Sequence, residues 1–139
     1  MGLYFLGSHG RAFHTGNGSW TLFRAIAEDY GWKPGGTIPP ANFDGGRWDG
    51  NYNSANGEEV SADDACALAS ALDHALRDVR FADRVTAVCY SLGFRDADAE
   101  GRISPKFWID ANNPKERAWL EHRLRDLATL CRDGSFKIW

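Results

Sequence analysis

The stretch SADDACALASALDHALRDV, residues 61–79, constrains the fold of this chain more than any other. Its apolar residues recur at spacings of three and four, along one face of a helix: Ala65, Leu68, Ala69, Leu72, Leu76 and Val79. Ser61 is a favoured N-cap, and Asp63 and Asp64 fall in the first turn, where the helix dipole favours negative charge. We therefore predict an amphipathic helix that buries one face against the rest of the protein.

Two further segments show helical periodicity. Residues 19–30 begin with Ser19 as a candidate N-cap and end before Gly31, which suits the left-handed position of a Schellman motif. Residues 81–92 also fit one helical face, although their β-branched residues leave a strand as the alternative. We expect a helix in both segments.

The last helix is predicted after Asn113, which is a good N-cap and is followed by Pro114, a favoured first helical residue. Glu116 is placed to reach back to the cap, as in a capping box. Gly134 is expected to close this helix. The residues that we expect to point inward are Leu120, Leu124, Leu127 and Cys131.

Both ends of the chain have the pattern of strands. LYFL, residues 3–6, is a short apolar run bounded by glycine, and FKIW, residues 136–139, alternates between apolar and polar. Residues 8–19 carry the turn residues of a hairpin or loop. We therefore expect residues 1–139 to form one α+β domain. Three main helices would pack on a small, mostly antiparallel sheet formed by the paired termini and a hairpin.

Residues 33–60 form a long segment without periodicity, rich in proline and glycine. A connection of this length is uncommon in a compact domain and is usually functional or folded on itself. Within it, Trp48 and Tyr52 flank Asp49-Gly50, a favoured turn pair, so the sequence predicts a hairpin at RWDGNY.

The same segment holds a candidate contact surface: Trp48, Asn51, Tyr52, Asn53 and Asn56. Exposed aromatic rings beside planar amides suit contact with a protein partner, or with a sugar or another polar ligand. In the alternative interpretation, the aromatic residues anchor the loop to the core and the asparagines satisfy turn geometry.

DADAEGRIS, residues 96–104, has the pattern of the first half of an EF-hand calcium loop. The oxygens that it offers come from Asp96, Asp98, Glu100 and the main-chain carbonyl of Arg102. The closing position, which needs a bidentate glutamate, falls on Phe107. Calcium is thus the one cofactor that the sequence suggests. We nevertheless expect a solvated acidic turn and no response of tryptophan fluorescence to calcium.

Composition excludes several partners. The 139 residues carry a net charge of −3, and the 16 basic residues are scattered among 19 acidic ones. We therefore expect no binding to nucleic acid or to an anionic membrane surface. No apolar run approaches a transmembrane helix, and the N-terminus lacks the pattern of a signal peptide. Three widely spaced cysteines indicate buried free thiols in a reducing cytoplasm.

The sequence contains no nucleophile elbow, phosphate-binding loop or metalloprotease motif. Its four histidines and three cysteines leave open a Cys-His pair that forms only in the fold, as a hydrolase would need. The sequence therefore does not decide whether the protein is an enzyme. It favours a protein without enzymatic activity.

Three stretches resemble a family of small uncharacterised bacterial proteins: YGWKPGGT, WDGNYNSANGEEVSADDACALASAL and LCRDGSFKIW. The family shows the same order of a YGW-P-GT segment, an Asn-Gly turn entering a DA-LA-AL helix, and a closing C-x-x-G-x-F-x-I strand. The resemblance does not extend across residues 81–112. It implies a bacterial or phage setting and an α+β domain, and it assigns no activity and no catalytic residue.

The sequence thus favours a cytoplasmic, non-catalytic protein that binds a protein partner and acts as an immunity or inhibitor protein. Mild acidity and an aromatic-rich loop with the composition of an interface favour this hypothesis. The alternatives are a domain that binds carbohydrate or calcium, and a hydrolase with a Cys-His pair.

Overall fold

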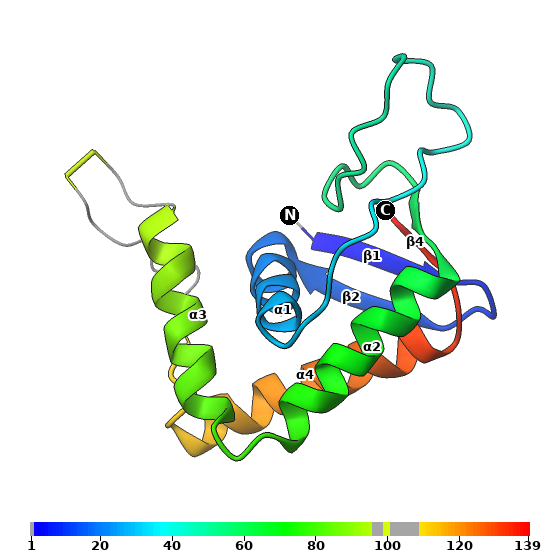
Figure 1. Ribbon diagram of the computed structural model, residues 1–139. Coiled ribbons are helices and arrows are strands. Elements are labelled where there is room, and N and C mark those ends of the chain that lie inside the picture. Colours follow the sequence, from blue (N-terminus) through cyan, green and yellow to red (C-terminus); the bar gives the residue numbers. More distant parts are fainter. Residues whose placement is uncertain (1, 96–98, 101–108) are drawn as a thin grey trace.

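The computed structural model describes residues 2–95, 99–100 and 109–139 (Figure 1). Its strands are β1 (Gly2–Gly7), β2 (Ala12–Gly16), β3 (Glu58–Val60) and β4 (Phe136–Ile138). Its helices are α1 (Asn17–Asp29), α2 (Ala62–Arg77), α3 (Phe81–Arg95) and α4 (Pro114–Arg132). The predicted α+β fold is confirmed, with α3 as a helix in addition to the three main ones.

The strands form one antiparallel sheet in the order β2-β1-β4-β3. Its centre pairs the two ends of the chain, as expected: Tyr4 N donates to Trp139 O at 2.9 Å, and Trp139 N donates to Tyr4 O at 2.8 Å. The N- and C-termini therefore lie side by side (Figure 1). The hairpin of the sheet is β1–β2. The hairpin predicted at residues 47–52 is wrong, because these residues form no strand.

One face of the sheet packs against the helices. Side chains alternate along each strand, so Phe5, Phe13 and Phe136 point to this inner face and are buried. The Phe5 ring lies 4.7 Å from the Trp20 ring of α1. Leucines of α2 and α4 complete the core and are fully buried: Leu68, Leu72, Leu120, Leu124 and Leu127.

The ends of α1 show one error and one success of sequence reasoning. The helix begins at Asn17, two residues before the predicted Ser19, and its N-cap Gly16 makes no side-chain capping bond. At the other end, Trp32 N donates to Ala27 O at 2.9 Å, and Gly31 has a φ of 100°. These are the features of the predicted Schellman motif.

The N-caps of α2 and α4 are confirmed. Ser61 Oγ accepts from Asp64 N at 3.2 Å, and Asn113 Oδ1 accepts from Lys115 N at 3.0 Å. The predicted capping box is wrong, because Glu116 Oε1 accepts from Asp110 N at 3.4 Å and Asn113 N donates to Asp110 O. The apolar face predicted for α2 extends too far, because the helix ends at Arg77 and Val79 beyond it is 93% exposed. Among the described residues, no helix is both long and apolar enough to cross a membrane.

Candidate functional site

The segment between α1 and β3, residues 33–57, is the largest irregular part of the described chain, and we call it the connecting loop. In Figure 1 it extends from the body of the protein beside the sheet, coloured cyan to green. It runs past the sheet edge, where Ile38 and Glu59 exchange main-chain hydrogen bonds of 2.8 and 2.9 Å. The loop is therefore anchored to the sheet edge at Ile38, in addition to its connections to α1 and β3 at its two ends.

A buried carboxylate in the first turn of α2 holds the first part of the loop. Asp64 is 7% exposed, and its Oδ1 accepts from Trp32 Nε1 at 3.0 Å and from Gly35 N at 3.2 Å. Its Oδ2 accepts from the Tyr52 hydroxyl at 2.6 Å. Hydrogen bonds to an ionised acceptor are among the stronger ones in proteins, so Asp64 ties both arms of the loop to α2.

Tyr52 is a correction to the predicted contact surface. It is 6% exposed, and its hydroxyl accepts from Gly36 N at 2.9 Å while it donates to Asp64. Burial, followed by the bond to the Asp64 carboxylate, raises the pKa of Tyr52 above its ordinary value. The expectation that Tyr52 is exposed is therefore wrong, and it cannot form a stacking platform with Trp48.

A second buried carboxylate holds the last part of the loop. Glu58 is fully buried, and its carboxylate accepts from three main-chain N–H groups: Ser54 at 2.7 Å, Ala55 at 3.2 Å and Asn56 at 2.9 Å. Ala55 adopts a φ of 57°, which lets successive N–H groups converge on one anion. The hydrogen bonds from residues 54–56 thus satisfy the buried carboxylate, and the same bonds hold this part of the loop in place.

Asn51 is used within the loop. Its Nδ2 donates to Asp49 Oδ1 at 2.6 Å, and its Oδ1 accepts from Ser54 Oγ at 2.5 Å and from Asn53 N at 3.2 Å. The interpretation of Asn51 as a turn residue fits this geometry, and its amide is not free to meet a ligand. Asn53 and Asn56 are exposed.

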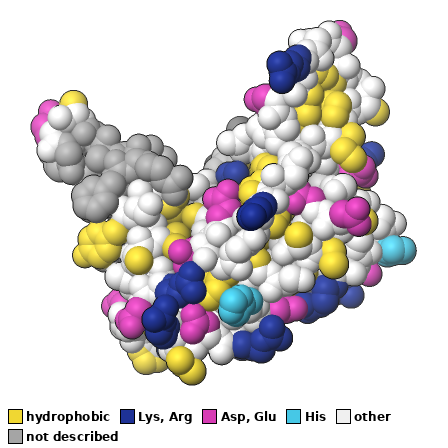
Figure 2. Space-filling view, viewed as in Figure 1, with side chains coloured by type: hydrophobic (Ala, Val, Ile, Leu, Met, Phe, Trp, Pro, Cys, Tyr) yellow, Lys and Arg dark blue, Asp and Glu magenta, His cyan; other side chains and the backbone are white. Residues whose placement is uncertain are grey.

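Phe43 and Trp48 form an aromatic pair at the surface of the loop. Their rings lie 5.0 Å apart, Phe43 is 37% exposed, and Trp48 is half-buried. The indole of Trp48 is oriented by its Nε1, which donates to Thr37 O at 2.9 Å. Figure 2 shows hydrophobic side chains gathered over this part of the surface, at the upper right.

We call Phe43, Trp48, Asn53 and Asn56 the loop surface. It keeps three of the five residues predicted from the sequence and adds Phe43. Sequence reasoning missed Phe43 because a single aromatic residue among prolines and glycines has no periodic neighbours to indicate its direction.

The predicted calcium ligands cannot be placed as a group. Asp96, Asp98 and Arg102 lie outside the described residues, and Glu100 is exposed. Within the described ranges, no group of three or more His, Cys, Asp or Glu side chains is arranged to hold a metal ion. The calcium hypothesis stays a prediction.

The cysteines and histidines lie in different surroundings. All three cysteines are free; Cys89 and Cys131 are buried, and burial raises the pKa of both thiols. The expectation of a buried thiol is wrong for Cys66, which is exposed on α2. All four histidines are exposed. In the part of the chain that the structure describes, no hydrogen bond joins a cysteine to a histidine.

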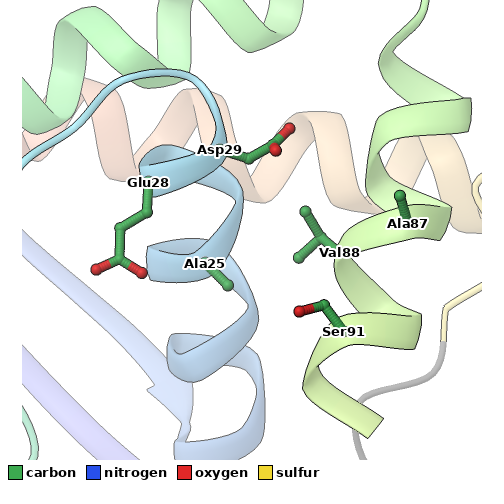
Figure 3. Close-up of a pocket in the computed structure, with 6 residues that line it drawn as sticks. All are labelled: Ala25, Glu28, Asp29, Ala87, Val88 and Ser91. Carbon is green, nitrogen blue, oxygen red and sulfur yellow. The ribbon is translucent and has the colours of Figure 1, made fainter. Parts of the chain in front are cut away.

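A small cleft lies between α1 and α3 (Figure 3). Its volume is about 230 Å³, below the usual 300–1,000 Å³ of a ligand pocket. Figure 3 shows Ala25 of α1 facing Val88 and Ser91 of α3, while the Glu28 side chain points away from α3. The Asp29 carboxylate at its rim is already paired with Arg84 Nε at 2.8 Å. This cleft therefore offers less for recognition than the loop surface.

Comparison with protein-family models, with curated proteins and with solved structures found no match to this chain.

Proposed function

We propose that this chain is a non-catalytic, bacterial or phage-encoded domain that binds a protein partner through the loop surface, as immunity and inhibitor proteins do. The observation that carries the proposal is the way the connecting loop is ordered. Two buried carboxylates, Asp64 and Glu58, hold 25 residues without regular structure beside the sheet. Long irregular segments of this kind in compact domains are usually functional.

The small loss of conformational freedom that an ordered loop undergoes on binding supports the same proposal. A loop that is already held by hydrogen bonds loses less conformational freedom when it binds, so more of the contact energy appears as affinity. Trp48 is held in this way, because its Nε1 donates to Thr37 O. An indole with a fixed orientation beside an exposed phenyl ring suits the apolar centre of an interface.

The polar residues of the loop surface suit its rim. Asn53 and Asn56 are exposed, and planar amides both donate and accept hydrogen bonds. Asp44 and Arg47 are also exposed on the same loop and provide charges of both signs. A partner with a shallow apolar depression bordered by hydrogen-bonding groups would match this surface.

The test needs a partner, and the proteins encoded by the adjacent genes are the first to try. Calorimetric titration with each of them is expected to show binding to one. Phe43→Ser should weaken that binding by about tenfold or more, since a buried aromatic contact is commonly worth more than 1 kcal/mol. The free energy of unfolding should change little, because Phe43 is partly exposed.

Val79→Ser is the matched control, because Val79 is an exposed apolar residue outside the loop. It should leave the affinity unchanged. An equal loss of affinity in both variants would place the interface elsewhere, and full affinity in Phe43→Ser would exclude the loop surface.

A further inference from the structure

The face of the sheet that points away from the helices is not covered by any described part of the chain. Because side chains alternate along a strand, the neighbours of the buried strand residues point outward. The outward residues of β1, β2, β3 and β4 include Tyr4, Leu6, His14, Glu59, Lys137 and Trp139. We call this surface the outer sheet face. Three large apolar side chains are exposed at it: Leu6 (38%), Trp139 (49%) and Ile38 (46%).

The strand register orders one row of side chains across this face. Leu6 of β1 lies opposite Lys137 of β4, and Lys137 lies opposite Glu59 of β3. Ile38 pairs with Glu59 and extends the row past the sheet edge. The row therefore reads apolar, positive, negative, apolar.

The two charges at the centre of this row have no partner side chain among residues 2–95, 99–100 and 109–139. Neither the Lys137 ammonium nor the Glu59 carboxylate forms a hydrogen bond or an ion pair within the described residues. Other acidic side chains on the surface do have partners, such as Asp73 with Arg132 at 2.8 Å and Asp29 with Arg84 at 2.8 Å. The row thus offers one unpaired charge of each sign, side by side, between two exposed apolar residues.

We propose that two copies of this chain associate face to face through the outer sheet face. The two-fold axis runs along the strands, between β3 and β4. This arrangement places Lys137 of one copy against Glu59 of the other, twice, and places Leu6 opposite Ile38 of the other copy. The sheets then pack with their strands nearly aligned, as the two sheets of a β-sandwich do.

The order of the row identifies a second copy as the occupant. In a two-fold symmetric interface, each contact between one residue and another is repeated with the roles exchanged, so the surface must be complementary to itself. A row that reads apolar, positive, negative, apolar meets this condition, because its reverse places each charge against the opposite one. A different partner would have no reason to require this symmetry.

The relief of the face also leaves room for a second sheet. Next to the row, Ser8 follows β1 and Ser135 precedes β4, and a hollow of about 270 Å³ is lined by these two serines together with Leu6, Glu59 and Lys137. On the other side of the row, the Trp139 indole packs against Gly57, where a Cβ atom would come within 2.6 Å of the ring. The hollow leaves space beside the row for side chains of a second copy.

Charge reversal tests the proposal with the full chain. Sedimentation equilibrium of the wild-type protein should show a dimer that dissociates on dilution. Lys137→Glu and Glu59→Lys each place like charges in contact, which costs several kcal/mol, so each should raise the dissociation constant by about 100-fold or more. An equimolar mixture of the two variants should dimerise again, because each charged residue then meets its opposite. Circular dichroism of each variant checks that it is folded.

A wild-type chain that stays monomeric at every concentration overturns the proposal, as does a mixture of the two variants that fails to associate. Dimers that persist unchanged in both variants place the contact on another surface and overturn it as well. The proposed partner binding is tested separately, because Phe43 lies outside this row. Loss of the dimer leaves that proposal intact, and failure to bind a neighbouring gene product leaves the dimer intact.

Discussion

The helical core and the connecting loop are ordered by different interactions. In the core, α2 and α4 pack through leucines that are completely buried, and the Asp73–Arg132 ion pair joins the two helices at their surface. In the loop, the chain has no regular structure, and the carboxylates of Asp64 and Glu58 collect its donors. Apolar packing is non-directional and tolerates small changes, whereas a buried carboxylate depends on each of its donors.

Because of this difference, the two regions should respond differently to amino-acid substitution. Removing one methyl group from the core leaves many contacts in place. Removing one charge from the loop leaves several buried donors without an acceptor, while the helices keep their own packing. A substitution in the core should therefore lower the stability of the whole protein. A substitution of comparable size at a loop contact should mainly loosen the loop.

The largest effect is expected from Leu124→Ala in α4. Leu124 is completely buried, so the variant should lose about 2–5 kcal/mol of the free energy of unfolding through lost burial and the cavity left behind. Urea unfolding measures this loss, and amide exchange should accelerate throughout the protein. Arg125→Ala, an exposed neighbour on the same helix, should change stability by less than about 0.5 kcal/mol. Similar losses in both variants would contradict the assignment of the core.

An intermediate effect is expected from Asp64→Asn, which keeps the shape of the side chain and removes its charge. The amide cannot accept from Tyr52 and Trp32 as the carboxylate does, so we expect a loss of about 1–3 kcal/mol. Amide exchange at Gly35 and Gly36 should accelerate more than exchange in α4.

Asp63→Asn is the control for that variant, since Asp63 is exposed in the same helical turn. It should leave both stability and loop exchange nearly unchanged. If Asp64→Asn accelerated exchange equally in the loop and in α4, the loop would not be a separately ordered region.

The smallest effect is expected from Trp48→Phe. The variant loses the hydrogen bond from Nε1 to Thr37 O, and Trp48 is half-buried, so the cost should be about 1 kcal/mol or less. Limited proteolysis should show faster cleavage within residues 38–50 and no change elsewhere. Faster cleavage in α2 or α4 would show that the loop and the core are coupled more tightly than their contacts indicate.

Most of the secondary structure could be predicted because its signals are local. Ser61 and Asn113 cap their helices as expected, and the leucines of α2 and α4 lie on the predicted faces. The pairing of the chain ends was also predictable, because two short apolar segments needed partners. The exceptions were Val79, where an apolar residue continued the pattern of α2 past the end of the helix, the start of α1, and the hairpin predicted at residues 47–52.

The candidate site was predicted less well. Trp48, Asn53 and Asn56 lie on the loop as expected, but Tyr52 is buried and Asn51 forms hydrogen bonds within the loop. From the sequence, Asp64 was expected to interact with the dipole of its helix. It does lie in the first turn of α2, but its main interactions are hydrogen bonds to the loop and to Trp32. Its partners Trp32, Gly35 and Tyr52 are 12 to 32 residues away in the chain.

Local sequence signals specify three of the helices, the terminal strands and the irregular character of most of residues 33–60, although residues 58–60 form β3. These depend on caps, on the spacing of apolar residues and on glycine and proline, all of which act within a few residues. The burial of Asp64 of α2 and Glu58 of β3 against the connecting loop follows only from the tertiary fold. The tertiary fold also decided that Lys137 lies between Leu6 and Glu59 on an uncovered face. Burial and strand register depend on residues far apart in the chain, and no local pattern specifies which of them meet.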